Sequence, residues 1–110
     1  MKKFQFLMDY RVNILKALAD PARLQIIDFL KDGEKCVCEI IPMLGKAQST
    51  TSKHLDILYD AGILDRRFEG KKTLYRIKDY RVFKLIRILD DLILRQLQPI
   101  VKTVEALKTS

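Results

Sequence analysis

Four glycines divide this chain into segments, and their positions limit its fold more than any other feature. Gly33, Gly45 and Gly62 each follow a stretch in which apolar residues recur at helical spacing, and Gly70 lies between two β-rich runs. Glycine often ends a helix or occupies a tight turn because it adopts left-handed backbone conformations without steric cost. The pattern predicts helices first, then a β-hairpin, then another helix.

The part of the chain before Gly33 predicts two helices. Apolar residues share one helical face through residues 8–18, and Asp20 and Pro21 then supply a helix cap and a first-turn proline. The second helix should run to about residue 31. Its apolar residues leave only a narrow polar strip, so we expect this helix to lie centrally in the core. A short third helix is predicted around residues 37–44.

Pro42 falls within this third helix. A proline is compatible with a helix only in its first turn, unless the helix is distorted.

The fourth predicted helix, about residues 49–61, has an inner face of Thr51, Leu55 and Leu58. Its opposite face carries short polar side chains and one lysine, namely Ser49, Ser52, Lys53 and Asp56. Such a face can approach base edges and phosphates in a major groove, although an ordinary solvated face is the alternative.

Residues 63–68 and 73–78 are predicted to form two strands of a hairpin. Basic side chains crowd it, at Arg66, Arg67, Lys71, Lys72 and Arg76. A basic hairpin can lie on phosphates or enter a minor groove, which adds salt-sensitive affinity; a solubilising surface is the alternative. Two short helices joined at Gly45 and followed by this hairpin predict a winged helix-turn-helix. The fold class is mainly α, with about five helices and a two-stranded β-hairpin wing.

The 110 residues predict a single domain and leave no room for a second catalytic lobe. The 21 basic and 14 acidic residues give a net charge of +7. This charge favours a polyanionic partner, although a ribosomal or membrane-surface protein would also carry it. We find no glycine-rich phosphate loop, no nucleophile with a base at motif spacing and no histidine–carboxylate cluster, so the chain is not predicted to be an enzyme. Without a signal-like start or a membrane-length apolar run, it is expected to be cytoplasmic.

Both cysteines, Cys36 and Cys38, precede the predicted DNA-reading helix. Two thiols so close can share one soft ion or oxidise together, and thiolates are favoured near a helix amino end. Positions i and i+2 point about 200° apart on a regular helix. One ion can therefore bind both sulfurs only if Cys36 lies outside the helix or the first turn unwinds. We expect ligation to deform the third helix and so disturb DNA docking by its neighbour.

Four motifs together resemble the ArsR/SmtB family of metal-sensing repressors: residues 14–24, 36–39, 48–55 and 61–64. The resemblance covers roughly residues 12–78. It implies a winged-helix homodimer that binds a double-stranded DNA operator without a cofactor and releases it when an effector binds. By the same resemblance, the DNA-contacting positions are Gln48, Ser49, Thr50, Ser52, Lys53 and His54.

One position in the recognition helix departs from the family pattern. Many relatives have a capping serine where this chain has Ala47. Either the cap shifts to Ser49 or the helix start is weakened by about 1 kcal/mol. His54 is the only histidine, so the paired carboxylate–imidazole zinc site that some relatives build on the last helix is predicted to be absent.

The resemblance implies that Cys36 and Cys38 bind trivalent arsenic or another soft metal ion. A third cysteine of arsenite-sensing relatives is replaced by Ile41, and residues 1–11 lack the amino-terminal cysteines of others. Two thiolates suit an organoarsenical, Cu(I) or Hg(II), or a three-coordinate site completed by Glu39. Dithiol redox sensing with the same cysteines, non-sensing buried cysteines and a non-sensing basic nucleic-acid-binding structural protein remain alternatives.

The last predicted helix, about residues 80–108, carries an apolar stripe that a chain of this size cannot readily cover. Pro99 should kink this helix or end it near residue 98. With the first helix, the stripe predicts a homodimer interface at Leu15, Leu85, Leu89, Leu92, Ile93, Leu97 and Ile100. Two-fold symmetry then implies a pseudo-palindromic operator with half-sites about one DNA turn apart. A helix lying on a membrane surface is the rival interpretation.

Overall fold

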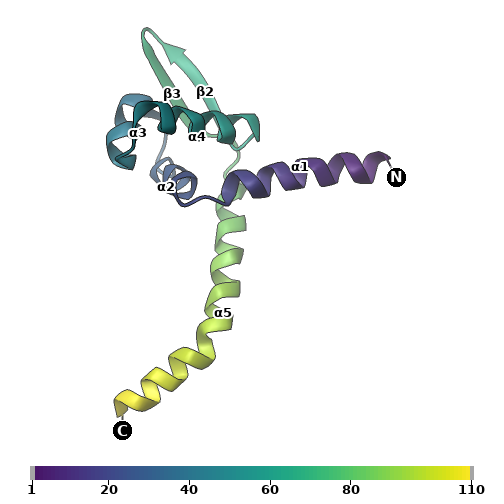
Figure 1. Cartoon of the computed structure of the whole chain (residues 1–110), viewed down its shortest axis with the longest axis vertical. Coiled ribbons are helices and arrows are strands. Elements are labelled where there is room, and N and C mark those ends of the chain that lie inside the picture. The colour runs from purple at the N-terminus through teal and green to yellow at the C-terminus, as the bar shows by residue number, and fades with distance from the viewer. Residues whose placement is uncertain (1, 110) are drawn as a thin grey trace. The chain divides into compact units, whose positions relative to one another are not determined.

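The computed structural model describes residues 2–109, which form two compact units divided between residues 79 and 80. The second unit is formed by one helix, α5 (Arg81–Thr109). The first unit contains, in chain order, α1 (Lys2–Leu18), α2 (Pro21–Phe29), β1 (Lys35–Cys36), α3 (Val37–Leu44), α4 (Gln48–Asp60), β2 (Leu64–Glu69) and β3 (Lys72–Ile77) (Figure 1). The predicted order of helices, hairpin and helix is confirmed.

The start of α2 follows from two adjacent residues. The Asp20 carboxylate accepts hydrogen bonds from the backbone N–H groups of Ala22 (2.8 Å) and Arg23 (3.2 Å), and Pro21 occupies the first turn. Burial disfavours the charged Asp20 carboxylate, but the two backbone hydrogen bonds outweigh this effect and hold its pKa below the usual value. The predicted cap is confirmed.

The core of the first unit is built around α2. Ile26, Ile27 and Leu30 are fully buried, as expected for a central helix with little polar surface. Side chains from the neighbouring elements complete the fully buried set: Ile40, Thr51, Leu55, Leu58 and Leu64. Because α3 and α4 each contribute to this core and contact each other, the helix-turn-helix pair is held by the same apolar contacts that stabilise the domain.

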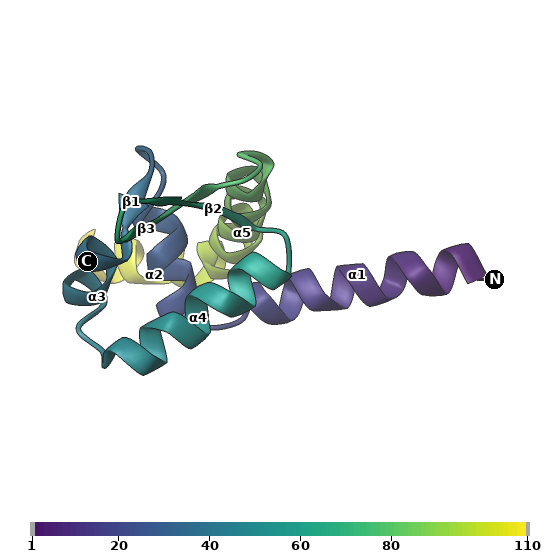
Figure 2. The same ribbon diagram turned by 90° about the horizontal axis from the view of Figure 1, so that it is seen from above.

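The sheet has three antiparallel strands in the order β1-β3-β2, where we predicted only two (Figure 2). The additional strand, β1, pairs Lys35 with Tyr75 and Cys36 with Leu74. Two residues are too few to produce a recognisable alternation, so sequence periodicity could not reveal this strand. Its presence matters because it joins the cysteine segment to the wing.

The wing is the hairpin β2–β3, whose last ladder pair is Glu69 with Lys72. Gly70 adopts a positive φ of 61° in the tight turn between them, a conformation that glycine tolerates and other residues rarely adopt. Tyr75 and Ile77 point into the core from β3. The hairpin is therefore anchored at its base while its tip is exposed.

Pro42 lies inside α3, beyond its first turn. It has no N–H group, so it cannot donate the usual helical hydrogen bond to the carbonyl of Cys38, four residues earlier. Gly45 then ends the helix in the left-handed conformation, with its N–H bonded to the Ile41 carbonyl at 3.0 Å. The helix around Cys38 thus lacks one backbone constraint of a regular helix.

Helix α5 continues through Pro99 to Thr109 instead of ending near residue 98. Figure 1 shows that it bends part-way along. The Thr103 hydroxyl donates to the Pro99 carbonyl at 2.9 Å. Of the two predicted outcomes, the helix therefore kinks and does not end. A proline inside a helix removes one backbone hydrogen bond, and the helix can still continue beyond it.

Candidate DNA interface and sulfur site

The two faces predicted for the recognition helix are present in α4. Thr51, Leu55 and Leu58 are at most 1% exposed and anchor the helix to the core. Gln48, Ser49, Thr50 and Lys53 are exposed, and Ser52 is half-buried. These five polar residues therefore keep surface that solvent can reach, while the inner face of the helix is buried.

Helix α4 begins without a side-chain cap. Ala47 occupies the N-cap position in an extended conformation, and no side chain bonds to the first N–H groups of the helix. Of the two possibilities that the sequence left open, a cap shifted to Ser49 is not observed, and the helix starts at Gln48 without a capping side chain. Thr51 directs its hydroxyl to the Ala47 carbonyl at 3.0 Å, which does not satisfy those N–H groups.

Replacing Ala47 with serine should stabilise the protein. The serine hydroxyl can accept a hydrogen bond from the exposed N–H groups at the start of α4, so we expect the free energy of unfolding to rise by about 1 kcal/mol. Urea denaturation at constant protein concentration measures this. Ala19→Ser is the matched control, because residue 19 is exposed and Asp20, not residue 19, is the N-cap of α2. Equal stability of both variants would contradict the uncapped start.

His54 differs from the other predicted DNA-contacting residues. Its side chain is only 15% exposed, and its Nδ1 lies 3.1 Å from Arg23 Nη1 and 4.0 Å from the Asp20 carboxylate. A guanidinium can only donate, so Nδ1 is the acceptor of this hydrogen bond. His54 therefore packs against the start of α2 rather than joining the exposed polar face.

Arg23 is a structural residue that the sequence analysis missed. Its Nε donates to the Ala17 carbonyl at 2.6 Å and its Nη2 to the Lys16 carbonyl at 3.1 Å, in addition to the contact with His54. One guanidinium thus satisfies carbonyls at the end of α1 and holds α4 beside them. The sequence offered one signal for this role, which is that Arg23 lies just after the helix-starting pair Asp20-Pro21.

Three arginines of the wing form ion pairs within the protein. Arg67 makes a bidentate pair with Glu34, with both N···O distances 2.8 Å. Arg76 bonds to Asp65 at 3.0 Å, and Arg66 lies 3.4 Å from Asp56 with its guanidinium over the Tyr59 ring. These carboxylates partly neutralise the positive charge of three arginines that we had predicted to contact DNA.

The ion pairs also affect the acidic partners. The hydrogen bond from Arg67 holds the pKa of Glu34 below its usual value, and the hydrogen bond from Arg76 does the same for Asp65. Both carboxylates therefore stay ionised at neutral pH. By contrast, Lys71 and Lys72 at the wing tip are exposed, and within residues 2–109 no ion pair involves either.

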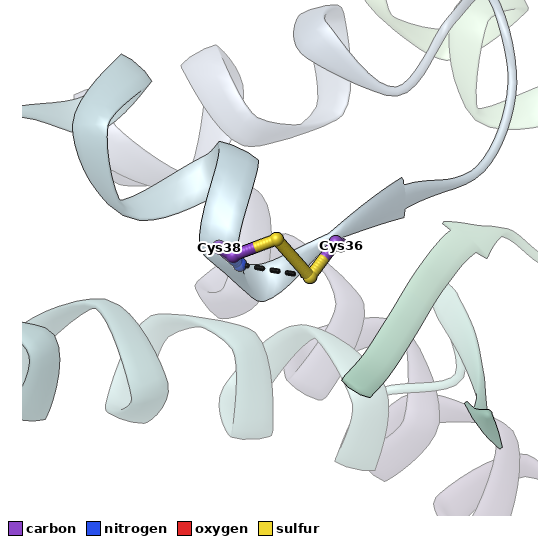
Figure 3. The surroundings of a disulfide bond; sticks show 2 residues. All are labelled: Cys36 and Cys38. Atoms are coloured by element: carbon purple, nitrogen blue, oxygen red, sulfur yellow. Dashed lines mark hydrogen bonds between the residues drawn. A yellow bond between two sulfur atoms is a disulfide. The ribbon is translucent and has the colours of Figure 1, made fainter. Parts of the chain in front are cut away.

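The two cysteines meet at the junction of β1 and α3 (Figure 3). Cys36 is 5% exposed and serves as the N-cap of α3, where its sulfur accepts a hydrogen bond from the Cys38 N–H at 3.1 Å. Cys38 is exposed in the first helical turn. The two sulfurs are joined in a disulfide.

Cys36 has an extended backbone and lies outside α3. This is the first of the two arrangements that allow both sulfurs to reach one ion, and it leaves the first turn intact. We expected ligation to deform α3 because two helical residues at i and i+2 point apart. With Cys36 outside the helix, this geometric reason no longer applies. The part of the chain that the structure describes contains no group of three or more His, Cys, Asp or Glu side chains suited to a metal. Glu39 as a third ligand therefore stays a prediction.

A groove of about 460 Å³ joins the sulfur pair to the predicted DNA-contacting surface. Cys36 and Cys38 lie on one side, the recognition helix contributes Gln48 and Ser52, and the wing contributes residues 71–73 and 75. Three elements far apart in the sequence thus share one concave surface.

None of the helices in residues 2–109 is both long and apolar enough to cross a membrane.

Known proteins resemble this chain in sequence and in fold. Residues 20–66 match the family model described as bacterial regulatory protein, arsR family. An uncharacterized HTH-type transcriptional regulator of Methanocaldococcus jannaschii is 48% identical over 81 residues, which cover 73% of this chain and 91% of that protein. The chain belongs to the ArsR family. Members of this family are DNA-binding transcriptional regulators rather than enzymes.

Two further proteins extend the comparison. A probable mercury resistance operon repressor of Streptomyces lividans is 36% identical over 80 residues, which cover 73% of this chain but only 64% of the repressor. The solution structure of a homodimeric winged helix-turn-helix DNA-binding domain from Mycobacterium bovis superposes with a TM-score of 0.78 at 33% identity, covering 87% of this chain and 92% of that domain. The winged helix-turn-helix prediction is confirmed.

Proposed function

We propose that this ArsR-family protein is a homodimeric repressor that leaves its operator when Cys36 and Cys38 capture a thiophilic metal(loid). The observation that carries the proposal is the groove in which both cysteines, the recognition helix and the wing meet. A ligand bound to these sulfurs would lie beside the surface that we assign to DNA. Such a site can change DNA affinity without a long-range conformational pathway.

DNA contact is assigned to the exposed polar face of α4 and to the wing tip. Short side chains on α4 suit close approach to base edges, whereas Lys71 and Lys72 suit phosphates. Because Arg66, Arg67 and Arg76 are engaged by carboxylates, their contribution requires exchange of an internal partner for a phosphate. We therefore expect the two lysines to contribute more to affinity than these arginines, and His54 to contribute least among the recognition-helix residues.

The homodimer is assigned to the apolar stripe of α5 together with Leu15 of α1. Leu15 is 65% exposed, and all six stripe residues, Leu85, Leu89, Leu92, Ile93, Leu97 and Ile100, are at least 42% exposed. Apolar surface of this extent normally marks an interface. The Mycobacterium bovis relative, described as homodimeric, supports the assignment. Two-fold symmetry then favours a pseudo-palindromic operator.

The effector class follows from the donor set. If Cys36 and Cys38 are the only protein ligands, their two thiolates suit a two-coordinate soft ion such as Hg(II) or Cu(I), or a trivalent arsenical in which carbon occupies the third position. The description of the Streptomyces lividans relative as a probable mercury resistance operon repressor agrees with a soft effector. Capture requires the reduced thiols, because the sulfurs of a disulfide are not thiolate ligands.

A connection from the sulfurs to the wing runs through β1. Cys36 pairs with Leu74 of β3, and Glu34, two residues before Cys36, holds Arg67 of β2. Any displacement of Cys36 on ligation would therefore be transmitted directly to both wing strands. This route replaces the predicted unwinding of α3 as the mechanical link to DNA release.

The test is an operator mobility-shift assay on the reduced protein, titrated with Hg(II), phenylarsine oxide and arsenite. We expect wild type to release DNA near one equivalent of Hg(II) or phenylarsine oxide per subunit. The Cys36→Ser/Cys38→Ser variant should bind the operator normally and remain bound at a tenfold excess. If the effectors released this variant from the operator at the concentrations that release wild type, the sulfur site would be excluded.

Dithiol redox sensing is a second candidate, favoured by the disulfide between Cys36 and Cys38. In this case, oxidation itself would change operator affinity, and dithiothreitol would restore it without any metal. Comparing reduced, metal-loaded and oxidised protein in the same assay separates the two candidates. If only oxidation changes operator affinity, the metal(loid) proposal is wrong and the redox function is retained.

A further inference from the structure

We propose that the groove beside the sulfur pair is a second half of the effector site, which binds an anionic substituent through Lys71 and Lys72. The preferred effector would be an organic trivalent arsenical carrying a carboxylate or similar anion, rather than a bare ion. This inference rests on the proposed function of Cys36 and Cys38. It adds to it the chemical class of the ligand.

The backbone arrangement places the lysines near the sulfurs. Cys36 pairs with Leu74 in an antiparallel ladder, so the chain leaving Cys36 runs in the direction of Thr73 and Lys72. Both cysteines and both lysines line the same groove of about 460 Å³. A second hollow of about 430 Å³ also contains Cys36 and both lysines. The two lysines therefore lie beside both cysteines in the main groove and beside Cys36 in the second hollow.

The charges available in this region favour an anion. The acidic residue of the main groove, Asp56, faces Arg66 at 3.4 Å. The second hollow adds Glu39 and Glu69, and Glu69 lies 3.1 Å from Arg67. Two of the three carboxylates thus already have cationic partners, whereas no ion pair within residues 2–109 engages Lys71 or Lys72.

The groove also exceeds the needs of an isolated ion. A single soft ion bound to two sulfurs occupies little of a volume of about 460 Å³, whereas sites for small organic molecules begin at about 300 Å³. Cys38 is exposed, so the arsenic atom can approach from solvent. Its substituent can then extend between Ser52 and the wing.

The capture step is a ligand exchange without a change of oxidation state. A hydrated arsenical, R–As(OH)₂, reacts with the two thiols to form R–As(S–Cys)₂, and two water molecules leave. Each thiol proton departs with a hydroxide, and arsenic remains trivalent. The anion on R would then occupy the lysines that we assign to DNA phosphate, so effector and operator would compete for the same cations.

The experiment compares two arsenicals of equal size, 4-carboxyphenylarsine oxide and its neutral 4-carboxamide, on the reduced 110-residue chain without DNA. Retention is measured by intact mass as the dithiothreitol concentration that removes half of the bound arsenical. The variants are Lys71→Gln/Lys72→Gln and, as a control, Lys78→Gln at the exposed position that follows β3. Lys78 does not line the groove.

We expect wild type and Lys78→Gln to retain the carboxylate about fivefold better than the carboxamide, the amount available from about 1 kcal/mol of exposed ion pairing. The preference should vanish in Lys71→Gln/Lys72→Gln and weaken with salt. If wild type retains both arsenicals equally, the anion site is wrong while the sulfur site stands. If neither arsenical binds through the cysteines, both proposals are overturned.

Discussion

Leu89→Glu/Leu92→Glu should separate the proposed homodimer and weaken operator binding by about 100-fold or more. Both leucines are about half exposed in the single chain, at 50% and 54%, and each would be buried in the proposed interface. Four glutamates in a two-fold interface would add unpaired buried charge where apolar contacts are needed. A single subunit holds one half-site, so its affinity approaches that of non-specific binding.

The dimer prediction is measured by sedimentation and by fluorescence anisotropy on operator DNA. Lys84→Gln/Lys102→Gln is the matched control, because it changes the charge of α5 by the same amount on exposed polar positions outside the stripe. This control should remain dimeric. A dimeric Leu89→Glu/Leu92→Glu variant with wild-type affinity would exclude α5 as the interface.

The second large effect is expected at the buried side of the recognition helix. Leu58 is fully buried, and Leu58→Ala removes most of its side chain from the core beneath α4. The lost apolar burial and the cavity together should lower the free energy of unfolding by about 2–5 kcal/mol. This is a large share of the roughly 5–15 kcal/mol typical of a small domain.

Ile57, the preceding residue on α4, provides the control because it is 42% exposed. Ile57→Ala should cost clearly less than Leu58→Ala, since less of the Ile57 surface is removed from water on folding. Urea denaturation at one fixed protein concentration compares them, because dimerisation makes apparent stability depend on concentration. Equal losses at both positions would contradict the packing of α4.

Much of the fold could be predicted because local patterns and tertiary packing agree. Asp20 and Pro21 begin a helix by local hydrogen bonding and fixed backbone geometry, which depend only on neighbouring residues. The alternation of buried and exposed residues on α4 also follows directly from the helical period. Such features need no knowledge of distant contacts.

The interpretation of the wing arginines shows where sequence reasoning stopped. A basic hairpin suggested a uniformly cationic surface, but Arg67 pairs with Glu34, a residue 33 positions earlier in the chain. The His54 contact with Arg23 spans 31 positions. Charge counts and helical periods contain no information about such long-range partners, so only the folded chain reveals which cations are engaged.

The sequence by itself determined the helix order, the hairpin turn at Gly70, the two-sided recognition helix and the spacing of the cysteines, because each depends on residues within a few positions of one another. Only the tertiary structure decided that residues 35–36 form a third strand, that Cys36 stands outside α3, and that both sulfurs share a groove with Lys71 and Lys72. Strand pairing and groove formation join distant segments. Their geometry is set by packing around the common core, which no local pattern encodes.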